Sequence, residues 1–250
     1  MRKMKLHKYL ANMGIDSRRK CEKLIVRGRV KINGMVVTKL GIEIDPEKDK
    51  IEVDNKNIKK DIPRIYIILN KPRGFLCTYN DPFGRPTIYD LLGNIETKLN
   101  YAGRLDFDSE GLIFLTNDGE LIHEITHPRK MIKKTYRVKV KGFPDDSDIK
   151  LLKEGVPLSA DFTTSSCQVK ILKKDNYDSI LEISISEGKK RQIRRMSSYL
   201  GFQVLELKRT EIGILNLDGL NTGQYRFLTE QEIDELKQCF QNKGKDNNNY

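Results

Sequence analysis

The residues best suited to chemistry stand in one glycine-bracketed segment, residues 103–119. Within it Arg104, Asp106 and Asp108 follow one another closely, and an apolar run at residues 112–115 comes directly after them. An ionised carboxylate can act as a nucleophile or as a general base. A loop that a strand anchors holds such a group firmly in place. Aspartate is also common in turns, so the position of Asp106 alone leaves both interpretations open.

Two further polar clusters have the composition of a binding surface. Residues 133–137 read Lys-Lys-Thr-Tyr-Arg, which is also typical of a strand with one buried ring and solvated cations. Residues 186–196 begin with a turn at Gly188 and continue into a helix whose exposed side is cationic. The positive end of a helix attracts phosphate, yet a solvated helix face explains the same residues equally well.

Several classes of function lack their motifs. Neither of the common Gly-rich phosphate loops occurs, which leaves nucleotide-driven enzymes and RNA methyltransferases unsupported, and there is no Gly-x-Ser-x-Gly elbow. No C-x-x-C pair exists, and the histidines form no metal spacing. We therefore expect no cofactor, no metal site and four reduced cysteines, which are Cys21, Cys77, Cys167 and Cys239.

The elements that would position these clusters lie in residues 66–240, which we predict to form the catalytic domain. Strands outnumber helices there and do not alternate strictly with them. This pattern predicts an α+β fold with a mainly antiparallel sheet flanked by helices. The expected strands are residues 66–69, 112–115, 136–140 and 181–185, and the expected helices are residues 121–125, 193–200 and 230–240.

A second, smaller α+β domain is predicted for residues 1–60, with a linker at residues 61–65. The chain carries a net charge of +11, and residues 1–60 supply +9 of it, from 17 Lys and Arg against 8 Asp and Glu. Charge concentrated in this way favours a polyanionic partner, because each phosphate contact releases condensed counterions. Residues 241–250, with three consecutive asparagines, are predicted to be a disordered tail.

The N-terminal pattern predicts two helices and a hairpin that turns at Asn33 and Gly34. It reads L-x-K-Y-L-A-x-x-G-x-x-S-R-R-x-x-E-x-L-I-x-x-G-R-V-x-I-N-G. Over about residues 4–55 it resembles the small RNA-binding domain named after the fourth ribosomal protein of the small subunit, the S-four domain. An ordinary amphipathic helix pair is the plainer alternative, but it does not require this run of matches.

The central segment reads G-R-L-D-x-x-[ST]-x-G-L-[LI]-[LF]-[LF]-T-N-D-G, and K-x-Y-R-V and E-G-x-x-R-Q-I-R-R-M follow it in that order. With Leu-Asn-Lys-Pro-Arg-Gly at residues 69–74, the combination resembles the RsuA/RluB family of rRNA pseudouridine synthases over about residues 4–240. The resemblance implies a cofactor-free isomerase. Such an enzyme detaches the uracil of a uridine in RNA, turns the base and rejoins it to the ribose through carbon 5. The uridine must leave its stack to reach the site.

The resemblance also implies a three-residue catalytic site. Asp106 corresponds to the catalytic aspartate, Tyr136 to the aromatic residue that stacks on the uracil, and Arg194 to the basic residue that pairs with the aspartate. We expect the ion pair with Arg194 to keep Asp106 charged in a dry pocket. Arg104 corresponds to the arginine that helps to hold the flipped-out state. Whether Asp106 attacks the base or the ribose, and whether it acts as nucleophile or base, remains open in the sequence.

The remaining expected RNA contacts are cations, which would grip the phosphate backbone with little reading of bases. One set lies on the second N-terminal helix and the adjoining hairpin, and another flanks the catalytic segments. Together with Arg104 they are Arg18, Arg19, Lys20, Lys23, Arg27, Arg29, Lys31, Lys71, Arg191 and Arg195.

The substrate prediction weighs three branches and one alternative class. Residues 80–87 look closest to the RluB branch and residues 111–116 to the RluF branch, both of which act on large-subunit (23S) rRNA. The RsuA branch, which acts on small-subunit (16S) rRNA, is the alternative. A non-catalytic assembly factor would have no need of a carboxylate in a basic groove, since it would repel phosphate. With no apolar segment long enough to span a membrane and no secretory signal, a cytoplasmic monomer is the default expectation.

Overall fold

The computed structural model describes residues 3–58, 63–95 and 97–242. The chain divides into two compact units: the first extends to Ile65 and includes residues 97–99 and 117–119, and the second contains the rest. Part of the predicted linker and residues 243–250 of the predicted tail lie outside the described residues. None of the helices in these ranges combines the length and hydropathy needed to cross a lipid bilayer.

The first unit packs two helices against a small antiparallel sheet of order β3-β2-β5-β6. Ser17 caps the second helix by accepting a hydrogen bond from the Lys20 amide. Asn33 and Gly34 both have positive φ, +51° and +83°, as a tight two-residue hairpin turn requires. The elements are β1 (Met4–Lys5), α1 (Leu6–Asn12), α2 (Arg18–Val26), β2 (Val30–Ile32), β3 (Met35–Val37), β4 (Glu43–Ile44), β5 (Ile51–Val53) and β6 (Lys56–Asn57).

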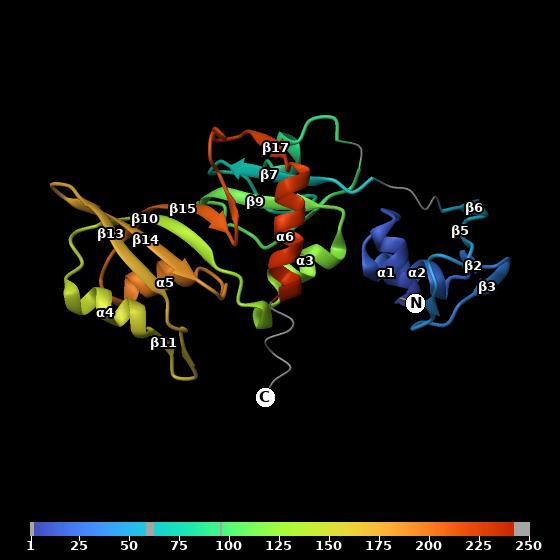
Figure 1. Ribbon diagram of the computed structural model, residues 1–250, viewed down its shortest axis with the longest axis horizontal. Coiled ribbons are helices and arrows are strands. Elements are labelled where there is room, and N and C mark those ends of the chain that lie inside the picture. The colour runs from blue at the N-terminus through green and yellow to red at the C-terminus, as the bar shows by residue number, and fades with distance from the viewer. Residues whose placement is uncertain (1–2, 59–62, 96, 243–250) are drawn as a thin grey trace. The chain divides into compact units, whose positions relative to one another are not determined.

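The second unit is built on a nine-stranded sheet whose main path runs β13-β14-β10-β15-β9-β7-β17 (Figure 1). Every pairing in this sheet is antiparallel except that of β15 with β9. The predicted α+β class with a mainly antiparallel sheet is therefore confirmed. Its strands are β7 (Tyr66–Lys71), β8 (Asn100–Tyr101), β9 (Glu110–Thr116), β10 (Lys134–Lys141), β13 (Gln168–Lys174), β14 (Asp178–Ile185), β15 (Val204–Ile212), β16 (Leu215–Asn216) and β17 (Tyr225–Phe227).

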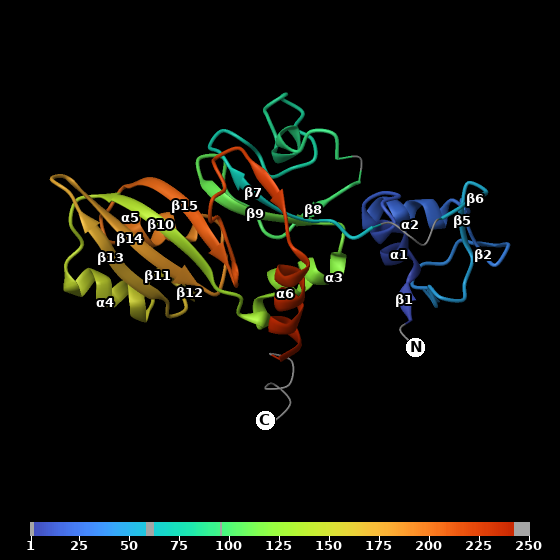
Figure 2. The ribbon, with the colours of Figure 1, turned by 45° about the horizontal axis from the view of Figure 1, so that its top comes forward.

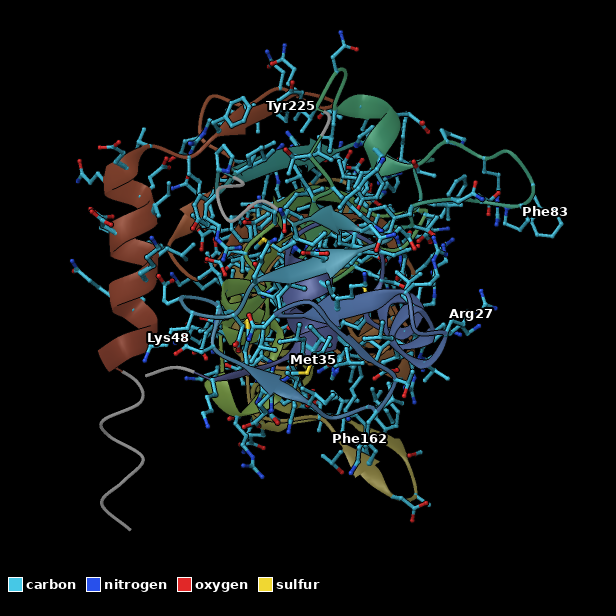
Figure 3. All side chains as sticks on the ribbon, turned by 90° about the vertical axis from the view of Figure 1, so that its right-hand side faces the viewer. Arg27, Met35, Lys48, Phe83, Phe162 and Tyr225 are labelled. Carbon is cyan, nitrogen blue, oxygen red and sulfur yellow. The ribbon has the colours of Figure 1, made fainter. Side chains whose placement is uncertain are left out.

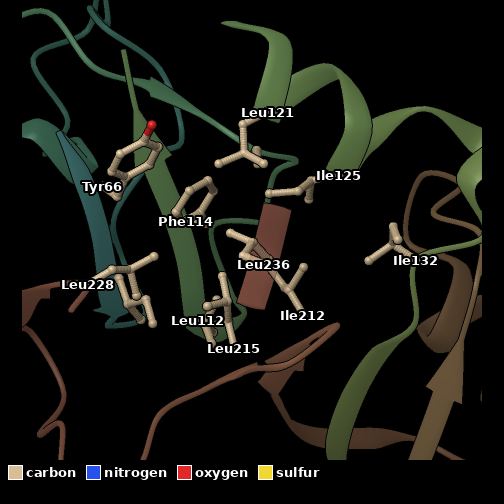
Figure 4. Packing of buried hydrophobic residues seen from close by; sticks show 12 residues of the cluster. Tyr66, Leu112, Phe114, Leu121, Ile125, Ile132, Ile212, Leu215, Leu228 and Leu236 are labelled. Carbon is tan, nitrogen blue, oxygen red and sulfur yellow. The ribbon is translucent and has the colours of Figure 1, made fainter. Parts of the chain in front are cut away.

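Helices cover both halves of this sheet. Helix α4 contacts β13 and α5 contacts β15, whereas α3 and α6 lie beside each other near β9 (Figure 2). A buried cluster joins Phe114 of β9 to Leu121 of α3 and Leu236 of α6 (Figure 4). The remaining elements are η1 (Ile88–Leu91), α3 (Gly119–Thr126), η2 (Pro128–Lys130), α4 (Asp146–Glu154), β11 (Pro157–Ser159), β12 (Phe162–Thr163), α5 (Gln192–Tyr199) and α6 (Glu230–Asn242).

The two halves of the sheet meet where β9 runs parallel to β15 over only two residue pairs, Lys208 with Glu110 and Arg209 with Gly111. A Cβ atom on Gly111 would lie 2.2 Å from the carbonyl oxygen of Arg209, and Gly111 has a φ of +110°. Both the close approach and the backbone conformation therefore require glycine here. The strands β9 and β15 consequently meet just after the loop that carries Asp106.

Candidate active site

The loop between β8 and β9 carries Asp106 and is fastened to the segment that follows β7. The Gly74 amide donates to the Phe107 carbonyl at 2.8 Å, and the Leu105 amide donates to Cys77 Sγ at 3.5 Å. Within the loop the Ser109 amide donates to the Asp106 carbonyl at 3.1 Å. The backbone on both sides of Asp106 is thus held by hydrogen bonds, as a rigidly positioned reactive group requires.

Two buried cations donate hydrogen bonds to backbone carbonyls in and around this loop. Lys71 is fully buried, and its Nζ donates to the carbonyls of Ser109 at 2.7 Å and Pro72 at 2.9 Å. Arg209 is only 2% exposed, and its Nε donates to the Leu112 carbonyl at 2.8 Å. Burial lowers the pKa of Lys71, although the nearby thiol and carboxylates oppose this shift. Lys71 therefore joins the end of β7 to the loop, and Arg209 joins β15 to β9.

The prediction that Lys71 contacts RNA needs correction. Its side chain has no exposed surface, and two of its hydrogen bonds go to backbone carbonyls of the chain itself. A phosphate could reach this ammonium group only by disrupting the loop that Lys71 supports. Lys71 is therefore a positioning residue for residues 106–109.

Asp106 lies at the surface of the site, with 36% of its side chain exposed. Its ion-pair partner is Arg191, whose Nη1 is 3.7 Å from Asp106 Oδ2. Arg191 stands at the start of α5 and has a left-handed backbone with φ of +52°. That conformation is uncommon for a residue with a side chain, so the surrounding structure must compensate for it.

A second carboxylate, Asp108, binds two arginines of the cationic segment at residues 186–196. Arg191 donates Nη1 and Nη2 to the two Asp108 oxygens at 3.2 Å each, and Arg194 Nη2 lies 3.3 Å from Asp108 Oδ2. Burial alone would raise the pKa of Asp108. The hydrogen bonds from Arg191 and the charges of both arginines outweigh that effect and hold the pKa below its usual value.

The expected pairing of Arg194 with Asp106 also needs correction. Arg194 Nη2 donates to the Asp108 carbonyl at 3.0 Å and lies 3.4 Å from Ser109 Oγ, while Nη1 donates to the Val204 carbonyl at 3.3 Å. These bonds direct the guanidinium to the backbone beyond Asp106. Its Nε is buried and has no hydrogen-bond partner among the described residues. Arg194 therefore positions the loop through Asp108, and Arg191 makes the contact with Asp106.

A hollow of about 440 Å³ opens beside these two arginines. Its walls are formed by α5, the turn that follows it and the start of β15. A polyanion at the site would meet the two arginines there. The hollow is lined by Arg191, Arg194, Ser198, Gly201, Phe202, Gln203 and Val204.

Tyr136 lies on β10, the strand next to β15 on the side away from β9. It is 8% exposed, and the β-sheet register pairs it with Arg209 of β15, which is itself paired with Gly111. No hydrogen bond between Tyr136 and Asp106 is found among the described residues. The sheet register therefore connects Tyr136 to the start of β9 through Arg209.

The other predicted RNA contacts are mostly exposed. Arg104 is exposed beside Asp106, and Arg195 is exposed on α5 with a bond from Nη2 to the Leu158 carbonyl at 3.0 Å. In the first unit Arg29 is held by Asp54, with Nε to Oδ1 at 2.6 Å, and Lys31 is half-buried. The remaining predicted contacts of that unit are exposed, and one of them, Lys20, pairs with Asp16 at 3.3 Å; they are Arg18, Arg19, Lys20, Lys23 and Arg27.

Sequence reasoning missed the role of Arg209 altogether. In the sequence Arg209 is one of several charged residues on this strand, together with Glu206, Lys208 and Glu211. Such a charged stretch is typical of a solvated strand. In the structure Arg209 is buried where β15 pairs with Gly111 of β9 on one side and with Tyr136 of β10 on the other. Asp108 and Ser109 were visible in the motif, but no spacing rule predicted that they hold Arg191 and Arg194.

Comparison with known proteins places this site in a family. Residues 65–199 match the family model described as RNA pseudouridylate synthase, and residues 4–51 match that of the S4 domain. Ribosomal large subunit pseudouridine synthase B of Bacillus subtilis (strain 168) is 41% identical over 235 residues, which are 93% of this chain and 95% of that protein. An uncharacterized RNA pseudouridine synthase of Aquifex aeolicus (strain VF5) is 40% identical over 237 residues, which are 94% of each chain.

A solved structure agrees with these sequence matches. A crystal structure of a pseudouridylate synthase, 35% identical in sequence, superposes with a TM-score of 0.67 and covers 93% of this chain and 99% of that one. The chain belongs to the RNA pseudouridylate synthase family and carries an S4 domain before its catalytic domain. The predicted family and enzyme class, an isomerase that acts on uridine in RNA, are thereby confirmed.

Proposed function

We propose that this protein converts a specific uridine of large-subunit ribosomal RNA into pseudouridine, with Asp106 as the catalytic carboxylate. The name of the Bacillus subtilis relative, a ribosomal large subunit synthase, supports this choice of substrate. The observation that carries the catalytic assignment is an accessible carboxylate on a loop whose backbone is hydrogen-bonded before and after it. The S4 domain and the net charge of +11 suit an RNA substrate.

The proposed reaction moves one glycosidic bond. The bond from uracil N1 to ribose C1′ breaks, the base turns, and a bond from C5 to C1′ forms. C5 then loses its proton, and N1 gains one. Asp106 must be ionised either to attack the ribose or the base or to take up a proton. Arg191 Nη1 lies 3.7 Å from Asp106 Oδ2, which is within ion-pair distance of the proposed reacting carboxylate.

The neighbouring residues are proposed to bind and orient the substrate. Tyr136 is the residue whose ring face would stack on the flipped uracil, and exposed Arg104 can hold the backbone of the flipped nucleotide. Arg194 keeps the loop in place through Asp108 and Ser109. Arg191 and Arg195 face incoming phosphates from α5.

The exposed cations of α2 are proposed to grip rRNA without reading its sequence. We expect the protein to act as a monomer in the cytoplasm, where it would meet rRNA or a precursor particle. Light scattering on the purified chain tests the first point: a monomer has the mass of one chain, 29.0 kDa.

Pseudouridine mapping in rRNA tests the substrate assignment. Cells without this protein should lose modification at one large-subunit site, or at a small group of adjacent sites, and regain it when the gene is restored. A gene carrying Asp106→Asn should fail to restore it. Loss of a small-subunit pseudouridine instead would overturn the large-subunit assignment, and unchanged rRNA would overturn the choice of rRNA as substrate.

A further inference from the structure

The segment between β7 and β8 presents an exposed aromatic ring. Phe83 is 81% exposed, more than any other large hydrophobic side chain in the described part of the chain. Figure 3 shows it at the outer end of its loop, directed away from the rest of the unit. A ring exposed to this degree contributes little to the core. Exposure of a single ring is common, so a role in binding depends on how the loop holds it.

The loop that carries Phe83 is built around one carboxylate. Asp81 Oδ2 accepts hydrogen bonds from the backbone amides of Phe83 and Arg85 and from Arg85 Nε, each at 3.1 Å. Its Oδ1 accepts one from Arg85 Nη2 at 2.7 Å. These bonds, those from the Arg85 side chain above all, lower the pKa of Asp81 to about 2. The tip is therefore a fixed turn and not a loose loop.

The neck of the same loop is closed. Leu76 and Thr87 form a β-bridge, and the Ile88 amide donates to the Leu76 carbonyl at 2.9 Å. The rings of Tyr79 and Tyr89 stack across the neck with centroids 4.4 Å apart. The backbone that carries the Phe83 ring is thus fixed before any partner binds, which reduces the entropy lost on binding.

The loop is also tied to the proposed active site. Cys77, at its base, exchanges hydrogen bonds of 3.5 Å with the backbone of Leu105, the residue before Asp106. Phe83 lies six positions after Cys77, which limits the distance between them to about 20 Å even for an extended chain. One RNA molecule seated at Asp106 is long enough to reach Phe83 as well.

We propose that Phe83 and Arg85 form a stacking site for an unpaired base of the substrate RNA, outside the pocket for the target uridine. The Arg85 guanidinium lies over the Phe83 ring, 5.4 Å from its centroid, and most of the ring remains open. Aromatic rings and guanidinium planes are the two side-chain surfaces on which RNA bases stack. This inference rests on the proposed function, because it takes RNA as the partner in a strongly basic chain.

Steady-state kinetics on a protein-free rRNA fragment containing the target uridine test the proposal. Phe83→Ala and Phe83→Leu should each raise KM about tenfold with kcat nearly unchanged, because base stacking is lost in both. Phe83→Trp should keep KM within about twofold, since it restores a flat ring. Tyr177→Ala is the matched control: Tyr177 is 78% exposed on the β13–β14 hairpin, and its loss should leave KM unchanged.

The RNA can be varied in the same assay. A fragment with an abasic residue at the stacked position should show the higher KM with the wild-type protein, and Phe83→Ala should add nothing further to it. Equal KM values for wild type, Phe83→Ala and Phe83→Leu would overturn the stacking site, and would point to a protein partner instead. Absence of pseudouridine with the wild-type protein would overturn the proposed function itself, so the two failures are distinguishable.

Discussion

Cations serve different purposes in the two units of this protein. On α2 of the first unit they are exposed and can exchange phosphate partners freely. Around the Asp106 loop they are buried or paired: Lys71 and Arg209 bond backbone carbonyls, and Arg191 and Arg194 bond Asp108. The same residue types are therefore free to bind phosphate in one unit, and hold the backbone and side chains of the Asp106 loop in place in the other. Their burial or their pairing with Asp108, and not their number, distinguishes the two uses.

The sharpest test of this contrast is Asp106→Asn. The substitution removes the charge needed for attack or proton transfer, so kcat should fall by about 1000-fold or more. Affinity for the rRNA fragment should stay within about threefold, because the exposed cations are untouched. Single-turnover pseudouridine formation and a filter-binding titration measure the two quantities. Activity within tenfold of wild type would refute the assignment of Asp106.

The close approach of β9 to β15 at Gly111, beside the buried Arg209, predicts that this contact between the two strands tolerates no added atom. Gly111→Ala would place a methyl group against the Arg209 backbone at a positive φ, and should cost about 3 kcal/mol of unfolding free energy or more. Gly223→Ala is the control, because Gly223 also has positive φ, +85°, but nothing lies near its Cβ position. It should cost only about 1 kcal/mol. Urea unfolding of both variants measures the difference, and equal costs would contradict a close contact between β9 and β15.

Asp108→Asn should loosen the two arginines without removing the proposed catalytic group. We expect kcat/KM to fall about 10- to 100-fold, since the loop and Arg191 lose their fixed arrangement. Ser165→Ala offers a control at an exposed hydroxyl, because the backbone amide that bonds Glu187 Oε1 at 2.9 Å is kept in this variant. Unchanged kcat/KM for Asp108→Asn would show that the pairing in the structure does not position the site.

The same pairing sets a dependence on pH. The pKa of Asp108 is lower in the folded protein than its usual value, so its carboxylate contributes stability above the unfolded pKa of about 3.9. That contribution disappears as the pH falls through the lower folded value. The stability gap between wild type and Asp108→Asn should therefore be present at pH 6 and should shrink below about pH 4. Urea unfolding across this range measures it, and a gap that widens in acid would contradict the sign.

The smallest effects are expected in the first unit. Arg19→Gln and Arg27→Gln should each weaken rRNA binding only a few-fold, and each should reduce the slope of log affinity against log salt by about 0.7 to 0.9. Lys150→Gln on α4 is the control, because Lys150 is also exposed but belongs to no predicted RNA contact. Binding titrations between 50 and 200 mM salt distinguish these variants. A large loss of kcat at saturating RNA would show that these cations do more than grip.

Local pattern and motif order were enough to predict the fold class and the family. The alternation at residues 136–140 and the Asn33–Gly34 turn depend on neighbouring residues only, and both are present in the structure. The partner of Asp106 could not be predicted in that way. Arg191 and Arg194 lie three positions apart on neighbouring turns, and their assignment to Asp106 or Asp108 depends on how α5 approaches the loop. The burial of Lys71 and Arg209 depends likewise on strand pairings distant in sequence.

The close contact of Gly111 with the Arg209 backbone has a consequence for how this protein can diverge in evolution. Its place in the motif beside Asp106 invites a chemical explanation, yet a hydrogen atom is required there because the Arg209 backbone occupies the space of any side chain. A duplicated gene that kept the aspartate but replaced this glycine would retain the signature of the enzyme while losing the contact between β9 and β15 on which it depends. Among descendants of this protein, the aspartate together with this glycine should therefore indicate preserved activity better than the aspartate alone.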